Sequence, residues 1–407
     1  HPWNTFKDPC NIRYTNQHEG TVHSSNLCTE ITLHTKASKY EEGEKTKIGE
    51  TAVCNLGSVN LFNHLIQKQV HGGSGWTIDY DKLKSTIHTA IRILDNVIDI
   101  NFYPTKEAAN SNLRNRPIGL GMMGVHDVCH KLNVNIDSKE AEEFNNKLFE
   151  FYSHHAIYAS SILAKEKGSY QTYEGSLWSK NILPIDSCNN LRSYRDKTNQ
   201  APTGKGESLE SWAKVRSHIK EFGMRNSNVM AIAPTATIGY INGVEQSIEP
   251  NFSVLFVYEN KSGNFYITNQ HFVTDMKERG LWSSEIAAMV KGADGDLSLL
   301  GDSIPEDLKR KYCTAFDRDM LKLVDCNAIR QKWIDQAISF NLYNKSTSLK
   351  YLNDIYMACW KSGLKTTYYL RNRAASKVEK STGSENSEES ACSIEAMKNG
   401  ETCESCQ

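Results

Sequence analysis

The sequence predicts an α/β fold with partly parallel strand pairing. Segments with helical periodicity alternate along the chain with short β-favouring segments, and parallel strands need crossover connections of this kind. The chain of 407 residues, 39% of them hydrophobic, is long enough for one large domain or two ordinary ones with a substantial core. At about residue 376 it becomes strongly polar. We therefore expect a globular part over 1–375 and a flexible tail over 376–407.

Three segments have apolar residues at the spacing of one helix face. The first ends before Pro104, and the third ends at Gly363. The second opens at Asp137, with Glu140 three residues later, and ends at Gly168. The positions that define the three faces are Leu83, Ile87, Ile91, Leu94 and Ile98 in the first, Phe144, Leu148, Phe151, His155 and Ile162 in the second, and Leu349, Leu352, Ile355 and Cys359 in the third.

Two short segments, Val254–Val257 and Thr366–Leu370, are rich in β-favouring residues and predict strands. The stretch Ser187–Glu207 contains many Ser, Asn, Lys and Gly residues and predicts an exposed loop. We find no internal repeat in the sequence.

The composition excludes several classes of protein. The chain has 47 basic and 48 acidic residues, which gives no basis for nucleic-acid or polybasic membrane binding. It contains no apolar run of about 18 residues, so no transmembrane helix is expected. The first residues, His1–Asn4, lack the features of a signal peptide and an initiator Met, and we expect an internal, processed or split-gene start. The 11 scattered Cys favour a reducing cytoplasm over a secreted disulfide scaffold.

The segment Ser25–Ile31 carries the first candidate site. If it is extended, Asn26, Cys28 and Glu30 project to one face, because side chains alternate with period two. A thiol flanked by an amide and a carboxylate that can act as a general base predicts a redox or nucleophilic site. The alternative is a buried Cys on an amphipathic strand.

Three further patterns have an ordinary structural interpretation, and one of them also has a functional one. Cys54 stands in an apolar, strand-like segment, typical of a core thiol. Pro234 suits the first turn of a helix, and Thr235 and Thr237 can cap that helix or bond phosphate oxygens at its N-terminus. The adjacent Tyr368 and Tyr369 would point to opposite faces of a strand, one ring in the core and one at the surface.

The tail ends in a Cys pair, Cys403 and Cys406, separated by two residues. Two thiols at this spacing can form a reactive disulfide and exchange it with other thiols. A zinc half-site is the competing interpretation, but zinc needs four ligands and no second pair of this kind is nearby. A long polar tether suits a swinging thiol pair, because its closure entropy grows slowly with length.

Several stretches together resemble the large, catalytic subunits of class I ribonucleotide reductases. Each stretch alone is weak evidence for the resemblance. Together they occur in the same order as in that family, and they cover the chain from near its first residue to its last. The stretches are Ser25–Ile31 (the active-site loop), Ala52–Leu61 (a strand with a redox cysteine), Arg116–Gly124, Ala233–Ile238 with Gln246–Pro250 (the substrate-phosphate segment), Asp335–Asn341, and Lys365–Arg371 (the paired-tyrosine strand).

The resemblance implies a role for each matching residue. Cys28 would carry the thiyl radical that takes the ribose 3′ hydrogen, Glu30 would act on the 3′ hydroxyl, and Asn26 would bond the ribose. Cys54 would be one of two reducing thiols, its partner lying upstream. Tyr368 and Tyr369 would relay the radical, and Cys403 and Cys406 would re-reduce the active-site disulfide. The substrate would be bound by Ser25, Asn26, Pro234, Thr235, Ala236, Thr237 and Ile238.

The same resemblance implies the fold and the partners. The fold would be the later part of a ten-stranded α/β barrel, which shields a radical from water. The chain would bind no metal or cofactor of its own, because the radical comes from the metal cofactor of a small subunit. ATP and deoxynucleotide effectors would bind the absent N-terminal part. The expected partners are the small subunit, a second large subunit, thioredoxin or glutaredoxin, and a ribonucleoside diphosphate, with no nucleic acid or membrane.

Two alternatives remain open from the sequence. A cobalamin-dependent, class II reductase would use the same barrel without a small subunit, whereas the tyrosine pair favours class I. The chain is also expected to lack the upstream thiol and effector sites, so it would be an inactive fragment or half of a split subunit.

Overall fold

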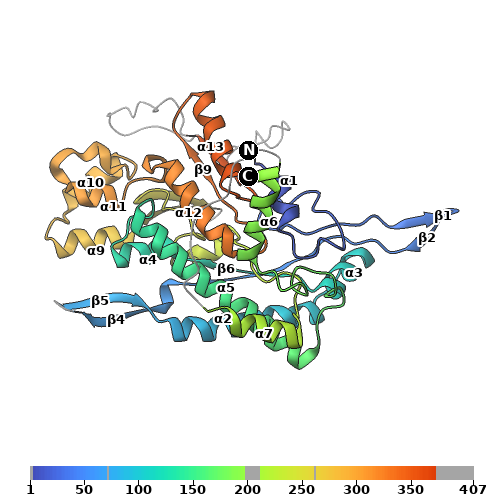
Figure 1. Ribbon diagram of the computed structural model, residues 1–407. Helices are drawn as coiled ribbons and strands as arrows, with labels where there is room; N and C mark the ends of the chain where they lie inside the picture. The colour runs from blue at the N-terminus through green and yellow to red at the C-terminus, as the bar shows by residue number, and fades with distance from the viewer. Residues whose placement is uncertain (1–2, 71–72, 198–210, 261–262, 373–407) are drawn as a thin grey trace. The chain divides into compact units, whose positions relative to one another are not determined.

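The computed structural model describes residues 3–70, 73–197, 211–260 and 263–372, which lie in one compact unit, His1–Arg373 (Figure 1). The helices are α1 Lys7–Ile12, α2 Tyr80–Ile100, α3 Lys106–Asn115, α4 Val125–Leu132, α5 Lys139–Lys167, α6 Pro184–Lys197, α7 Ala213–Phe222, α8 Ala236–Ile241, α9 Gln270–Glu278, α10 Ser284–Gly292, α11 Glu306–Lys311, α12 Met320–Trp333 and α13 Leu349–Lys361. The strands are β1 Lys39–Glu41, β2 Glu44–Lys47, β3 Asn55–Asn60, β4 Leu65–Val70, β5 Gly73–Ile78, β6 Ile118–Met123, β7 Leu255–Asn260, β8 Gly263–Thr268, β9 Leu342–Asn344 and β10 Leu370–Asn372.

A parallel array of backbone segments forms the centre of this unit. β3 pairs with β6 in parallel, and Leu120 of β6 pairs in parallel with Met230 of the next segment. Ile232 then pairs with Ile338, and β9 pairs with β10, again in parallel. The sequence-based prediction of a mixed α/β fold with parallel pairing is therefore confirmed.

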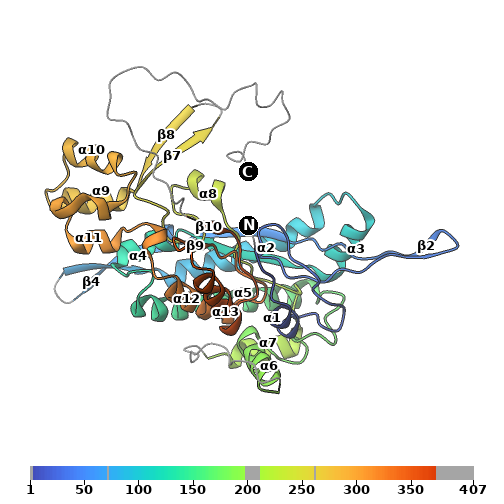
Figure 2. The ribbon, with the colours of Figure 1, turned by 90° about the horizontal axis from the view of Figure 1, so that it is seen from above.

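Long helices connect these segments and cover the array. α2 links β3 to β6, and its buried face contains the apolar residues Leu83 to Ile98 that defined the predicted helix. α2 and α12 both pack against α5 (Figure 2). The three helices and β6 contribute residues to one large hydrophobic core. Such crossover helices let neighbouring strands run in the same direction.

The helix predictions are confirmed in position, with small corrections at the ends. α5 is capped by Ser138, whose side chain accepts the N–H of Ala141, and not by Asp137 as expected. Asp137 instead accepts a hydrogen bond from Arg318. α13 buries Ile355 and Cys359 as predicted, whereas Leu349 of the same predicted face is exposed.

Two predictions, one of a loop and one of a strand, were wrong. Over 187–197 the expected loop is the greater part of α6, because Leu191 and Arg195 are buried and Arg195 pairs with Asp8. The rest of that expected loop, 198–207, lies outside the described residues. The expected strand Thr366–Leu370 is displaced, since the paired strand β10 starts at Leu370. The other predicted strand corresponds to β7.

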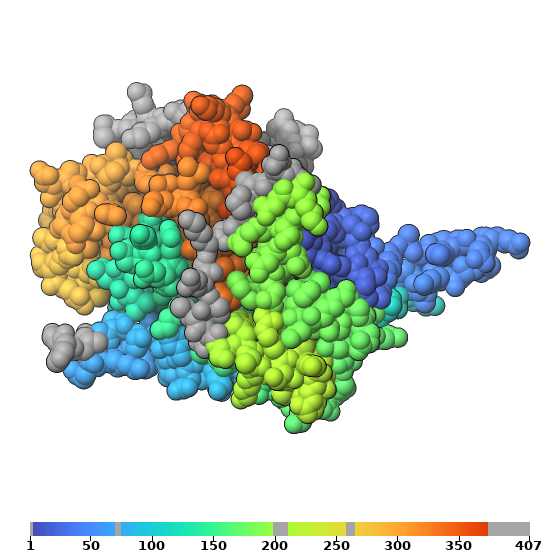
Figure 3. Space-filling model, viewed as in Figure 1, coloured from blue at the N-terminus to red at the C-terminus, as the bar shows by residue number. Residues whose placement is uncertain are grey.

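Hairpins extend from this core. β1 and β2 pair antiparallel with every residue exposed, and they form a narrow arm in the space-filling view (Figure 3). β4 with β5 and β7 with β8 are also antiparallel. Among the described residues, no helix combines the length and apolar character needed to cross a membrane.

Candidate active site

The segment that carries Cys28 is a turn and not the extended strand considered from the sequence. Thr29 has a left-handed φ of 67°, and its N–H donates to the carbonyl of Asn26. The turn lies against the parallel array, because Ala337 donates its N–H to the carbonyl of Glu30 and Thr29 donates its hydroxyl to the carbonyl of Thr367. Period-two alternation therefore does not explain how the site residues meet.

The thiol of Cys28 lies beside the tyrosine pair. Its Sγ is 3.5 Å from the hydroxyl oxygen of Tyr368, and the rings of Tyr368 and Tyr369 stack with centroids 3.8 Å apart. The three side chains therefore form a continuous series of contacts. The expectation that the two rings point to opposite faces was wrong.

A bulge in the parallel pairing explains the stacking. Tyr368 donates its N–H to the carbonyl of Phe340, and the carbonyl of Tyr369 accepts the N–H of Leu342. In a regular parallel ladder one residue would make both bonds, so two residues here occupy the place of one. An extra residue interrupts the alternation of side chains, and both tyrosine rings lie together.

Glu30 is buried next to the thiol, with 2% of its surface exposed. Burial raises the pKa of Glu30, while hydrogen bonds from Asn26 and Ser339 oppose that rise. The Ser339 hydroxyl lies 3.2 Å from the Glu30 carboxylate and also reaches the carbonyl of Cys28. Ser339 has one hydrogen to donate, so it can serve either group at a given time. Ser25 closes the turn by donating to the carbonyl of Ile31.

Cys54 lies just before β3 and contacts the same loop through Gln336. The side-chain Nε2 of Gln336 is 3.4 Å from Cys54 Sγ. Burial raises the pKa of Cys54 to about 12, and the charges of Asp335 and Glu30 add to that rise. At neutral pH the sulfur therefore keeps its hydrogen. Burial also raises the pKa of Cys28.

The expected phosphate segment begins α8, with one correction. The helix starts at Ala236, so Pro234 precedes it and does not occupy its first turn. Thr235 adopts a left-handed φ of 51°, and its hydroxyl oxygen accepts the N–H of Ser247 instead of capping the helix. Ala236, Thr237 and Ile238 line a pocket of about 260 Å³ together with Leu56–Ser58 of β3.

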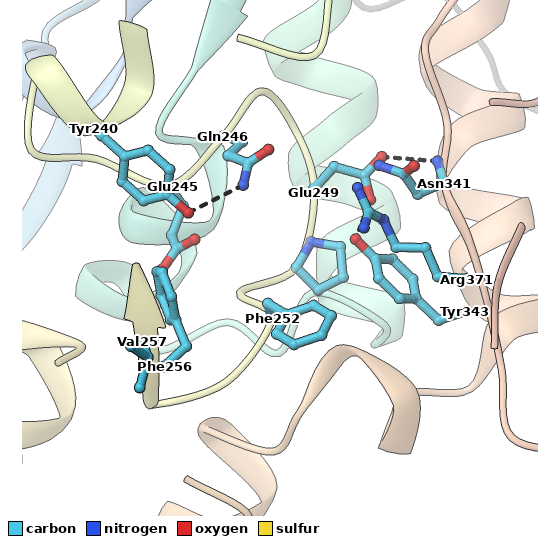
Figure 4. Close-up of a pocket in the computed structure, with 11 residues that line it drawn as sticks. Tyr240, Glu245, Gln246, Glu249, Phe252, Phe256, Val257, Asn341, Tyr343 and Arg371 are labelled. Carbon is cyan, nitrogen blue, oxygen red and sulfur yellow. Dashed lines mark hydrogen bonds between the residues drawn. The ribbon is translucent and has the colours of Figure 1, made fainter. Parts of the chain in front are cut away.

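A second pocket, of about 250 Å³, includes Arg371 (Figure 4). The guanidinium carbon of Arg371 lies 5.5 Å from the ring centre of Tyr369. Its wall includes the carboxylate of Glu249, which accepts the backbone N–H of Asn341 and the hydroxyl of Tyr343. Burial raises the pKa of Glu249 to about 7. Glu249 thereby ties the loop after α8 to β9, the neighbour of β10.

The structure brings together most of the residues singled out from the sequence. Asn26, Cys28, Glu30, Tyr368 and Tyr369 form one contact network. Cys54 joins it through Gln336, which also accepts the N–H of Thr32. Cys403 and Cys406 lie outside the described residues.

Sequence reasoning missed Gln336, Ser339 and Glu249 as individual residues. All three lie in stretches that supported the family resemblance. An amide or hydroxyl in an apolar segment, or a lone carboxylate, gives no chemical signal until its partners are known.

A group of potential metal ligands lies away from the thiols. Glu19, His34 and Glu50 offer atoms within 4.8 Å of one another. Lys36 and Arg114 each form ion pairs with both carboxylates of the group, Glu19 and Glu50. These cations therefore already neutralise the negative charge of the two carboxylates. We interpret the group as a buried ion-pair network and not as a metal site.

This network predicts a loss of stability in acid. Burial alone raises the pKa of Glu50, but hydrogen bonds from His34 and Asn115 outweigh it and hold the pKa at about 2. The unfolded value is about 4.3, so the stabilising effect is present above that pH and is lost as pH falls toward 2. We expect Glu50 to contribute on the order of 2 kcal/mol to this pH dependence. Urea unfolding of the chain and of Glu50→Gln between pH 6 and 2.5 tests this, and parallel pH profiles would contradict it.

The fold and these groups define a class of protein. An α/β domain with two protonated thiols, a buried carboxylate and stacked phenols has the groups of a thiol-dependent oxidoreductase. The family model described as "Ribonucleotide reductase, barrel domain" matches residues 1–370. The chain therefore belongs to the ribonucleotide reductase family.

Named relatives agree with this assignment. Ribonucleoside-diphosphate reductase subunit alpha of Chlamydia pneumoniae is 48% identical over 381 residues, which cover 94% of this chain and 34% of that protein. The large subunits of Danio rerio and Arabidopsis thaliana are 36% and 35% identical, over 91% and 94% of this chain. The aligned region covers 43% and 45% of those two proteins. The chain thus spans between a third and a half of the length of these relatives.

Proposed function

We propose that this chain supplies the thiyl-radical site of a class I ribonucleoside-diphosphate reductase, which makes 2′-deoxyribonucleotides for DNA synthesis. The observation that carries the proposal is the contact of Cys28 Sγ with the Tyr368 hydroxyl at 3.5 Å, continued by the stacked ring of Tyr369. A small subunit, through its metal cofactor, supplies the oxidising equivalent that reaches Tyr369.

Transfer from tyrosine to sulfur needs a hydrogen on the thiol. A Tyr368 phenoxyl radical takes the hydrogen atom of Cys28, so the S–H bond breaks, the phenolic O–H bond forms, and the unpaired electron stays on sulfur. The raised pKa of Cys28 favours this step, because burial keeps the thiol protonated. The S–H bond is close enough in strength to a ribose C–H bond for the next transfer to be reversible.

The neighbouring groups fit the reduction that follows. The Cys28 radical takes the 3′ hydrogen of the ribose, and the carboxylate of Glu30 accepts the 3′ hydroxyl proton. Asn26 bonds the ribose while the 2′ hydroxyl leaves as water. Cys54 and an upstream thiol each give up a hydrogen and end as a disulfide, which supplies the two electrons. Return of the 3′ hydrogen restores the Cys28 radical.

The diphosphate of the substrate binds at the start of α8 in this proposal. The pocket lined by Ala236, Thr237, Ile238 and the β3 residues Leu56–Ser58 supports it, because β3 begins directly after Cys54. Backbone N–H groups at the start of a helix have no partner within that helix and attract anions.

The remaining partners are proposed by analogy with the family. The parallel segments around β3, β6, β9 and β10 would contribute to one side of a ten-stranded barrel. Cys403 and Cys406, on the tail after residue 375, would pass electrons from thioredoxin or glutaredoxin to the disulfide of Cys54. Large subunits would pair as a homodimer in the cytoplasm, with effector nucleotides bound by an N-terminal part.

Reconstitution tests the proposed activity. The chain would be mixed with a matching N-terminal polypeptide, a class I small subunit and a dithiol, and the formation of deoxycytidine diphosphate would be measured with and without adenosylcobalamin. We expect activity that needs the small subunit and ignores cobalamin. Activity that needs cobalamin alone would assign the chain to class II, and inactivity in both mixtures would overturn the proposal.

A further inference from the structure

The side chain of Gln336 is completely buried, and its two backbone partners fix its orientation. Its Oε1 lies 3.3 Å from the N–H of Thr32, and its Nε2 lies 3.1 Å from the carbonyl of Ile118. A backbone N–H can only donate and a carbonyl can only accept. The two ends of the amide are therefore assigned by their partners and cannot be interchanged.

This orientation determines what faces the sulfur of Cys54. The atom 3.4 Å from Cys54 Sγ is Nε2, whose second hydrogen is free to point at the sulfur. The sulfur must then accept, and its own S–H hydrogen points elsewhere. The carbonyl of Asn55, at 3.9 Å, is a weak acceptor for that hydrogen.

We propose that Gln336 is a positioning residue that holds the Cys54 sulfur as a hydrogen-bond acceptor and stabilises its thiolate form. This inference rests on the proposed redox role of Cys54. A donor bonded to sulfur binds the negatively charged form more strongly than the neutral form. It also leaves the S–H hydrogen of the reduced thiol available for transfer.

The thiolate form of Cys54 is produced when the disulfide between Cys54 and the upstream thiol is reduced again. A thiolate of an external dithiol attacks the sulfur bonded to Cys54, a new S–S bond forms there, and the old S–S bond breaks. Its electron pair stays on Cys54, which later takes a proton from water. A sulfur that is stabilised as a thiolate is a faster leaving group. Negative charge develops on the Cys54 sulfur in this step, and the side-chain N–H of Gln336 points at that sulfur.

If Gln336 had a purely structural role, its replacement would have the opposite effect on the ionisation of the Cys54 thiol. Gln336 also joins the backbones of Thr32 and Ile118, so its loss could simply loosen the packing around the sulfur. Loosening would expose the thiol to water and make it ionise more readily. Loss of a donor in an intact core would make it ionise less readily.

The experiment is alkylation of the 407-residue chain by iodoacetamide between pH 7.5 and 10, with modification at Cys54 measured by peptide mass spectrometry. Gln336→Met removes the donor, and Gln336→Glu keeps the shape but places a carboxylate oxygen against sulfur. We expect Cys54 to react about tenfold more slowly in Gln336→Met, and more slowly still in Gln336→Glu.

Two controls accompany these variants. Cys28 in the same samples has no hydrogen bond to Gln336 and should react at an unchanged rate. Gln331→Met removes another buried glutamine, whose Nε2 bonds the backbone carbonyls of Ile334 and Gln336. It disturbs the packing at Gln336 but keeps the Gln336 side chain, so Cys54 should not react more slowly in this variant. An equal or faster reaction of Cys54 in Gln336→Met overturns the inference, as does failure of both Gln336 variants to fold. The assay uses no reductase turnover, so an inactive reconstituted enzyme would reject the proposed function without changing this result.

Discussion

Cys28→Ser is expected to abolish nucleotide reduction in the reconstituted enzyme, with turnover reduced at least about a thousandfold. Serine fits the space of cysteine, but its O–H bond is much stronger than an S–H bond. The Tyr368 radical therefore cannot take the hydroxyl hydrogen at a useful rate. The measurement is deoxycytidine diphosphate formed per large subunit, with folding checked by circular dichroism.

Cys10→Ser is the matched control for this variant. Cys10 is completely buried, and its Sγ donates to the carbonyl of Lys365 at 3.3 Å, a bond that a serine hydroxyl can replace. It lies outside the contacts that link Cys28 to the tyrosines, so its replacement should change turnover by less than about threefold. Retained activity in Cys28→Ser would remove the basis of the radical mechanism.

Tyr369→Phe is expected to reduce turnover by more than about a hundredfold while leaving the fold intact. Phenylalanine preserves the ring that stacks on Tyr368 at 3.8 Å, but it has no phenolic hydrogen to lose. Oxidation therefore cannot pass from a small subunit to Tyr368. The measurement is turnover in the reconstituted enzyme together with the yield of radical on the large subunit by electron paramagnetic resonance.

Tyr356→Phe serves as the control, because Tyr356 is a partly buried tyrosine of α13 that packs against the core. Its turnover should stay close to that of the unmodified chain. If Tyr369→Phe remains active with a small subunit, the stacked pair is not the radical route. If it remains active with adenosylcobalamin alone, the chain belongs to class II.

The sequence located the three helices, but it predicted their buried faces fully only for α2. Of the face predicted for α5, only Leu148 is buried, and Leu349 of α13 is exposed. The apolar positions from Leu83 to Ile98 define α2, and Ile355 and Cys359 are buried in α13 as expected. The polar α6 was mistaken for a loop, because Arg195 is buried by pairing with Asp8, a residue far away in the sequence. Local composition contains no information about such a distant partner.

The sequence by itself determined the family, because a set of motifs in a fixed order is specific even when each motif is weak, and it singled out Cys28, Glu30, Cys54, Tyr368 and Tyr369 as candidate site residues. Their arrangement was decided by the tertiary structure. The left-handed Thr29 turns the Cys28 segment, and a bulge at Tyr368 and Tyr369 stacks two rings that a regular strand would separate. Gln336 meets Cys54 across 282 residues of sequence. Hydrogen bonds between distant backbone segments fix each of these features, and such bonds are formed only when the chain is folded.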